Sequence, residues 1–125
     1  MTIQQVKGTQ SFSRGIDVLQ IISDHAKPII FNDILKESSL TRPTLYRILS
    51  SLEEEGLVHK TNSKHYRLGS RLISLAHNAL TQIDIRRIAF TALSELRDET
   101  GETVHLAIRS RDMMVYVDKF ESKEI

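Results

Sequence analysis

The 125-residue sequence contains no cysteine and no tryptophan. Without cysteine the chain has no disulfides, no thiolate metal site and no thiol nucleophile, which agrees with a reducing compartment. No apolar run approaches the ~20 residues that a membrane-spanning helix needs, and residues 1–7 lack the apolar core of a signal peptide. We therefore expect a cytoplasmic protein that does not bind a membrane.

Neither sign of charge dominates, since 17 lysines and arginines oppose 16 acids for a net charge of +1. This balance gives little support for nucleic-acid binding, so the local distribution of charge matters more. Residues 57–72 show the sharpest local contrast, because they contain no acid. Their cationic and histidine side chains are Lys60, Lys64, Arg67, Arg71, His59 and His65.

Residues 41–56 are the most informative stretch, because they read as one bounded helix. Thr41 is a suitable N-cap, Pro43 fits the first turn, and Gly56 supplies a left-handed stop. Spacings of three and four residues give this helix an apolar stripe, which predicts that it packs on neighbouring helices. The stripe consists of Leu45, Ile48, Leu49 and Leu52.

The opposite face of this helix carries candidate DNA-binding residues. It offers guanidinium, hydroxyl and aromatic groups over its first three turns, and its acids begin only at Glu53. Arg47 is the central candidate, for a guanine or a phosphate, and the alternative is a solvated arginine paired with Glu54 or Ser51. Tyr46 is equally suited to packing between helices. The candidates are Arg42, Pro43, Thr44, Tyr46, Arg47, Ser50 and Ser51.

The residues before this helix predict a helix-turn-helix. Residues 1–10 read as a loose arm, and a helix should follow it, capped by Ser11 or Ser13. A second helix, residues 33–38 capped by Asn32, leaves only a short turn before Thr41. The core face expected for the first helix comprises Phe12, Ile16, Leu19 and Ile22, with Val18 and Ile21 beside them.

The residues after Gly56 predict a β-hairpin. Residues 57–60 and 65–68 are extended runs around a turn-rich segment, so the whole reads as a winged helix-turn-helix. Lys60, Lys64 and Arg67 in this wing are expected to neutralise DNA phosphates, and Arg14 is a further phosphate candidate. Arg67 is also a candidate for orienting the hairpin.

Residues 70–83 predict a helix with a wide apolar surface, which we interpret as a linker helix that pairs with a second copy of the chain. Asp84 can cap a further helix over residues 85–100, whose inward face would comprise Ile88, Ala89, Ala92, Leu93 and Leu96. Two strands then follow, around residues 103–109 and 113–119. One helix and two strands cannot enclose a core, so residues 84–125 read as the start of a domain or rely on partner contacts.

Metal binding and catalysis find no support in the sequence. The five histidines lie on different predicted elements, and only His59 and His65 are candidate cross-strand neighbours. The sequence has no Gly-x-Ser-x-Gly elbow and no glycine-rich phosphate loop. We therefore expect neither an enzyme nor a cofactor or metal ion.

Four segments in order resemble the IclR family of bacterial transcriptional regulators: residues 13–19, 40–57, 66–69 and 99–107. The resemblance implies a mainly α fold with a small β-wing, in which a linker helix leads to a GAF-like α+β domain. It also implies a homodimer, often paired into tetramers, that binds a partly palindromic DNA operator and responds to a small metabolite, often a carboxylate. The expected divisions are an arm (1–10), a winged helix-turn-helix (11–69), a linker helix (70–83) and an incomplete effector domain (84–125).

The function that these patterns favour is sequence-specific DNA binding by a transcriptional regulator, whether repressor or activator. The alternative is a winged helix that docks another protein without binding specific DNA. The acid-free wing argues against this alternative, and a fall in DNA affinity as salt rises would separate the two.

Overall fold

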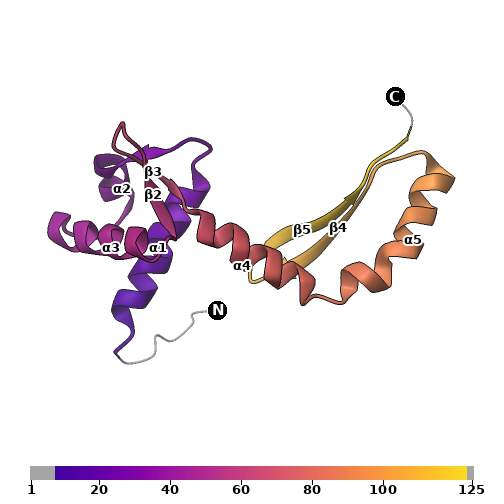
Figure 1. Ribbon diagram of the computed structural model, residues 1–125, viewed down its shortest axis with the longest axis horizontal. Helices are drawn as coiled ribbons and strands as arrows, with labels where there is room; N and C mark the ends of the chain where they lie inside the picture. The colour runs from indigo at the N-terminus through magenta and orange to yellow at the C-terminus, as the bar shows by residue number, and fades with distance from the viewer. Residues whose placement is uncertain (1–7, 124–125) are drawn as a thin grey trace. The chain divides into compact units, whose positions relative to one another are not determined.

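The computed structural model describes residues 8–123, and these divide between Leu75 and Ala76 into two compact units (Figure 1). Among the described residues, no helix has the length and apolar character to cross a membrane. The elements in chain order are α1 (Gln10–Asp24), β1 (Ile29–Ile30), α2 (Phe31–Glu37), α3 (Arg42–Glu54), β2 (Val58–Lys60), β3 (His65–Leu68), α4 (Ser70–Thr81), α5 (Ile85–Thr100), β4 (Val104–Ser110) and β5 (Met113–Phe120).

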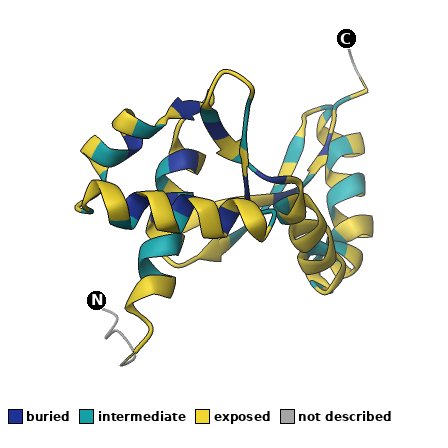
Figure 2. Cartoon of the chain, turned by 60° about the vertical axis from the view of Figure 1, so that its left-hand side comes forward, coloured by how far each residue is buried: buried dark blue, intermediate teal, exposed yellow. Residues whose placement is uncertain are grey.

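The first unit is a winged helix-turn-helix, as the sequence predicts. Helices α1, α2 and α3 surround a shared apolar core, and an antiparallel sheet in the order β1-β3-β2 completes it. In Figure 2 the buried residues of these helices lie on their inward sides, and the outward sides are exposed. The fold class predicted from the sequence is therefore confirmed. The core consists of Val18, Ile22, Ile29, Ile34, Leu45, Leu49, Leu52, Val58 and Tyr66.

Both ends of α3 lie where the sequence places them. Thr41 occupies the N-cap position, but its hydroxyl donates to Thr44 Oγ1 at 2.9 Å and not to the backbone. Gly56 follows the helix with φ of +74°, and the Leu57 N–H donates to the Leu52 carbonyl at 2.9 Å. This pairing satisfies a carbonyl of the last turn and ends the helix.

Two expectations about α1 are wrong. Helix α1 begins at Gln10, so Ser11 and Ser13 lie inside it, and Thr9 precedes it without a side-chain cap. Phe12 is 71% exposed, because the first turns of α1 extend past the neighbouring helices (Figures 1 and 2), and the buried face starts at Val18. The loose arm is expected over residues 1–10; of these, residues 1–7 lie outside the described residues, and Gln10 belongs to α1.

The expected cap of the second helix is also wrong. Helix α2 starts at Phe31, so Asn32 lies within its first turn and Ile30 occupies the N-cap position. The Asn32 side chain accepts a hydrogen bond from Arg42. A tertiary contact has replaced the local one, because the turn between the helices brings α3 against the start of α2.

A close backbone contact joins the end of α3 to the end of the wing. The Gly69 N–H donates to the Leu57 carbonyl at 2.8 Å, and the Arg71 N–H donates to the Gly56 carbonyl at 3.3 Å. A Cβ atom at residue 69 would lie 2.2 Å from the Gly56 carbonyl oxygen, so only glycine fits. The Arg71 side chain adds an ion pair to Glu55 Oε2 at 2.7 Å.

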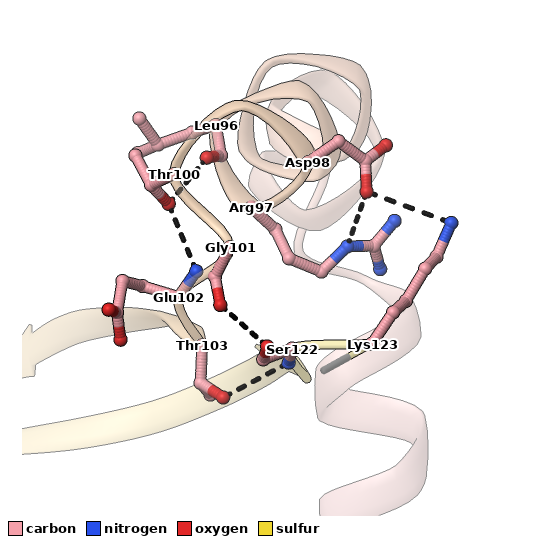
Figure 3. Close-up of polar contacts among 9 residues, drawn as sticks. All are labelled: Leu96, Arg97, Asp98, Thr100, Gly101, Glu102, Thr103, Ser122 and Lys123. Atoms are coloured by element: carbon pink, nitrogen blue, oxygen red, sulfur yellow. Dashed lines mark hydrogen bonds and ion pairs between the residues drawn. The ribbon is translucent and has the colours of Figure 1, made fainter. Parts of the chain in front are cut away.

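The second unit contains α5 and the hairpin of β4 and β5. A cluster of polar contacts joins the end of α5 to the end of β5 (Figure 3), in which the Ser122 hydroxyl donates to the Gly101 carbonyl at 2.6 Å. In the same cluster Asp98 accepts a hydrogen bond from Arg97 at 3.0 Å, and that contact lowers the pKa of the Asp98 carboxyl below its ordinary value.

No residue of α5 is fully buried. The prediction that one face of this helix points into a core is therefore wrong. Ile88 is 70% exposed, and Leu96 is also exposed. Phe90 of α5 contacts the hairpin, since its ring lies 5.7 Å from that of Phe120.

We predict that Gly69→Ala destabilises the first unit by roughly 2–3 kcal/mol, because the new methyl group would overlap backbone that cannot rotate away. Thermal and urea unfolding followed by circular dichroism measure this loss. The matched control is Gly15→Ala in α1, where a Cβ would meet only Leu52 Cδ2 at 4.0 Å. This substitution should stabilise the protein by about 0.5–1 kcal/mol through helix propensity. Equal stabilities for the two variants would contradict the close packing of Gly56 and Gly69.

Candidate nucleic-acid interface

The exposed face of α3 presents donor groups without acids. Pro43, Arg47 and Ser50 are all exposed on this helix, and Glu53 and Glu54 follow only in its last turn. Within residues 8–123, Arg47 makes no hydrogen bond and no ion pair, so the alternative pairing with Glu54 or Ser51 is not observed. Its guanidinium is therefore free to donate hydrogen bonds to a group outside the chain.

A groove of about 500 Å³, which we call the wing groove, lies between α2, the start of α3 and the wing. It brings together four of the residues predicted to bind DNA: Arg42, Tyr46, Lys60 and Lys64. Three of these are cations, and they come from two separate elements and the turn that follows β2. An anionic chain that follows this groove would meet all three of them.

A second groove of about 590 Å³ lies on the other side, between α1 and α3, and we call it the α1 groove. It brings Arg14, Thr44, Arg47 and Ser51 together on one surface. Its remaining lining is largely apolar and includes Phe12. Helix α3 is thus flanked by two hollows, and each is lined by residues that the sequence predicts to bind DNA.

The remaining predicted residues lie apart from these grooves. Arg67 on β3 pairs across the sheet with His59, and its guanidinium donates to the Leu68 carbonyl at 3.2 Å. Because His59 pairs with Arg67, and His65 pairs with Ile30 on the other side of β3, the prediction that His59 and His65 are cross-strand neighbours is wrong. Residues 8–123 contain no group of three or more potential metal ligands.

Two residues of the wing groove, Phe31 and Asn32, were not predicted from the sequence to belong to the site. The Asn32 Oδ1 atom accepts a hydrogen bond from Arg42 Nη2 at 3.1 Å, and the Arg42 guanidinium lies 5.3 Å from the centre of the Phe31 ring. Asn32 was predicted to cap a helix, and Phe31 was given no role. No local pattern relates either residue to Arg42, because the contact depends on how two helices meet.

Two family models match the chain. The model described as the IclR helix-turn-helix domain matches residues 11–61, and the model described as the bacterial transcriptional regulator IclR C-terminal matches residues 77–125. Together they span both units of the structure.

Curated proteins and solved structures give the same result. The HTH-type transcriptional regulator XynR of Escherichia coli is 35% identical over 91% of this chain and 46% of its own length. The DNA-binding transcriptional repressor YiaJ of the same organism is 29% identical over 91% of this chain and 41% of its own length. The chain therefore spans less than half the length of these relatives.

The crystal structure of an IclR-type transcriptional regulator from Alicyclobacillus acidocaldarius has a TM-score of 0.76 and 28% identity, and the match covers 98% of this chain and 49% of that one. A regulator from Brucella abortus reaches a TM-score of 0.84 at 23% identity, covering 98% of this chain and 48% of that one. The fold seen here thus occurs in chains about twice as long.

Proposed function

This chain belongs to the IclR family of bacterial transcriptional regulators, and on that premise we propose that it is a sequence-specific DNA-binding regulator. The observation that carries the proposal is the recognition helix α3. Its exposed face is free of acids over the first three turns, Arg47 has no partner among residues 8–123, and grooves lined with cations flank the helix on both sides. A helix of this kind fits the major groove of DNA.

In the proposed complex, Arg47 and Ser50 face base edges while the surrounding cations bind phosphates. A guanidinium that forks onto a guanine distinguishes that base, whereas phosphate contacts fix the register and carry no sequence information. Lys60, Lys64 and Arg14 suit the second role, because they lie beside α3 and not on its outer face.

We propose a homodimer that recognises a partly palindromic operator, and α4 supports it. None of the residues of α4 is buried, and Ile73 is 73% exposed. A second copy packed on this helix would cover its apolar surface and place two recognition helices in half-sites about 34–36 Å apart, or a multiple of that spacing. Pairing of dimers into tetramers belongs to the same proposal.

A small metabolite is proposed as the effector, and residues 77–125 would be the start of the domain that binds it. The match of these residues to the IclR C-terminal model supports the assignment. The effector would change DNA affinity only if it bound the conformation that binds DNA and a second conformation with different affinities.

The first test of this function is selection from a random duplex pool at near-physiological salt, with the parent chain and with Arg47→Ala. We expect a palindromic motif from the parent. We expect Arg47→Ala to lose about 1–3 kcal/mol of affinity for this motif and to tolerate other bases at defined positions.

The matched control for that selection is Arg87→Ala, which removes the same charge from an exposed site in the second unit. It should select the parental motif with parental affinity. A parent that selects no motif would contradict sequence-specific binding and favour a winged helix that docks protein. An Arg47→Ala variant indistinguishable from the parent would contradict the assignment of Arg47.

The dimer is tested by Leu75→Glu, because Leu75 is 50% exposed on the apolar side of α4. We expect this variant to sediment as a monomer where the parent sediments as a dimer, since a buried unpaired carboxylate is strongly unfavourable. The control is Ser74→Glu, which adds the same charge on the polar side of the helix and should leave the mass unchanged. An unchanged mass for Leu75→Glu would remove α4 from the interface.

A further inference from the structure

The wing groove gathers three cations, one more than the α1 groove. Its three cations, Arg42, Lys60 and Lys64, share one hollow of about 500 Å³, and no carboxylate is among the described residues that line it. None of these cations takes part in an ion pair within residues 8–123. Arg71, at the other end of α3, is by contrast paired with Glu55 at 2.7 Å.

Neutral groups hold two of these cations in place. Arg42 lies over the Phe31 ring at 5.3 Å and donates to Asn32 Oδ1 at 3.1 Å. On the facing wall, the Lys60 ammonium lies 5.7 Å from the centre of the Tyr66 ring. Rings and amide oxygens restrict the side chains but leave their charge intact, whereas a carboxylate would neutralise it.

From this arrangement we propose that Asn32 is a positioning residue, which holds the Arg42 guanidinium toward a phosphate of a DNA backbone lying in the wing groove. Arg42 has five N–H donors, and the Asn32 contact uses one. The remaining donors are available for a phosphate, with Lys60 and Lys64 on the other side and the exposed Tyr46 beside them. The inference deepens the DNA-binding function proposed above and rests on it.

The proposal assigns this groove to affinity and not to sequence. Contacts between cations and phosphates release counterions, so they strengthen binding to any duplex and make it depend on salt. The exposed face of α3, with Arg47 and Ser50, remains the part of the unit that distinguishes bases. Loss of the groove should therefore weaken all duplexes alike and leave the selected motif unchanged.

The test measures binding of the whole chain to a labelled duplex of arbitrary sequence, by fluorescence anisotropy over a range of salt concentrations. Arg42→Ala should lower the slope of log affinity against log salt by about 0.9, the value for one lost phosphate contact. Asn32→Ala should weaken binding roughly three- to tenfold, with a smaller change of slope, because Arg42 is released but keeps its charge. Asn32→Asp should weaken binding at least as much as Arg42→Ala, because the new carboxylate would neutralise the guanidinium.

A double variant separates positioning from an independent contact. In the Arg42→Ala background, Asn32→Ala should have no further effect. Gln20→Ala is the matched control, because Gln20 is also an exposed amide that makes one side-chain hydrogen bond, to Asp24 at 2.8 Å, and it lies outside the groove. It should bind as the parent does. Circular dichroism confirms that each variant is folded.

The outcomes separate this inference from the proposed function. Parental binding by both Asn32 variants, or an additive loss in the double variant, would overturn the role of Asn32 even where the parent still selects a motif. If the variants change the salt dependence as expected but the parent selects no motif, phosphate binding in the groove would be supported and sequence-specific binding would be contradicted. A parent that binds no duplex at any salt concentration would overturn both.

Discussion

The backbone contact between Gly56 and Gly69 determines where the wing lies relative to the recognition helix. Gly69 donates to the Leu57 carbonyl at 2.8 Å, and there is no room for a side chain at residue 69. The contact closes the hairpin at the point where α3 ends, so the wing is held against the helix and not free to swing away. Lys60 and Lys64 can therefore share one groove with Arg42 on α3.

The charges of the first unit divide into neutralised and available ones, and the division follows from their immediate partners. Arg71 belongs to the acid-free run of residues 57–72, yet Glu55, which precedes this run, forms an ion pair with it at 2.7 Å. Arg42 and Lys60, in contrast, are restrained by uncharged groups. The net charge of +1 hides this difference, and a count of the basic residues in 57–72 overstates the free charge of that run.

The sequence predicts those features that depend on local pattern. Apolar spacing and the Gly56 stop define α3 correctly, and the turn-rich segment between two extended runs defines the wing. Features that depend on how elements meet were not predictable. Asn32 contacts Arg42 instead of capping a helix, and Phe12 fits the periodicity of a core face but is exposed in the α1 groove. The DNA-binding roles of the individual residues remain predictions.

The helix α4 links the geometry of the wing to the proposed dimer. It has 12 residues, a length at which an isolated helix is only marginally stable in water. Its first turn is fixed to the base of the wing through Arg71, but its apolar residues farther along remain exposed. Burial of that surface against a second copy would stabilise the helix and, because its start is fixed, would also set the separation of the two recognition helices. The same contact would then supply stability and operator spacing, so a change at the α4 interface should alter both.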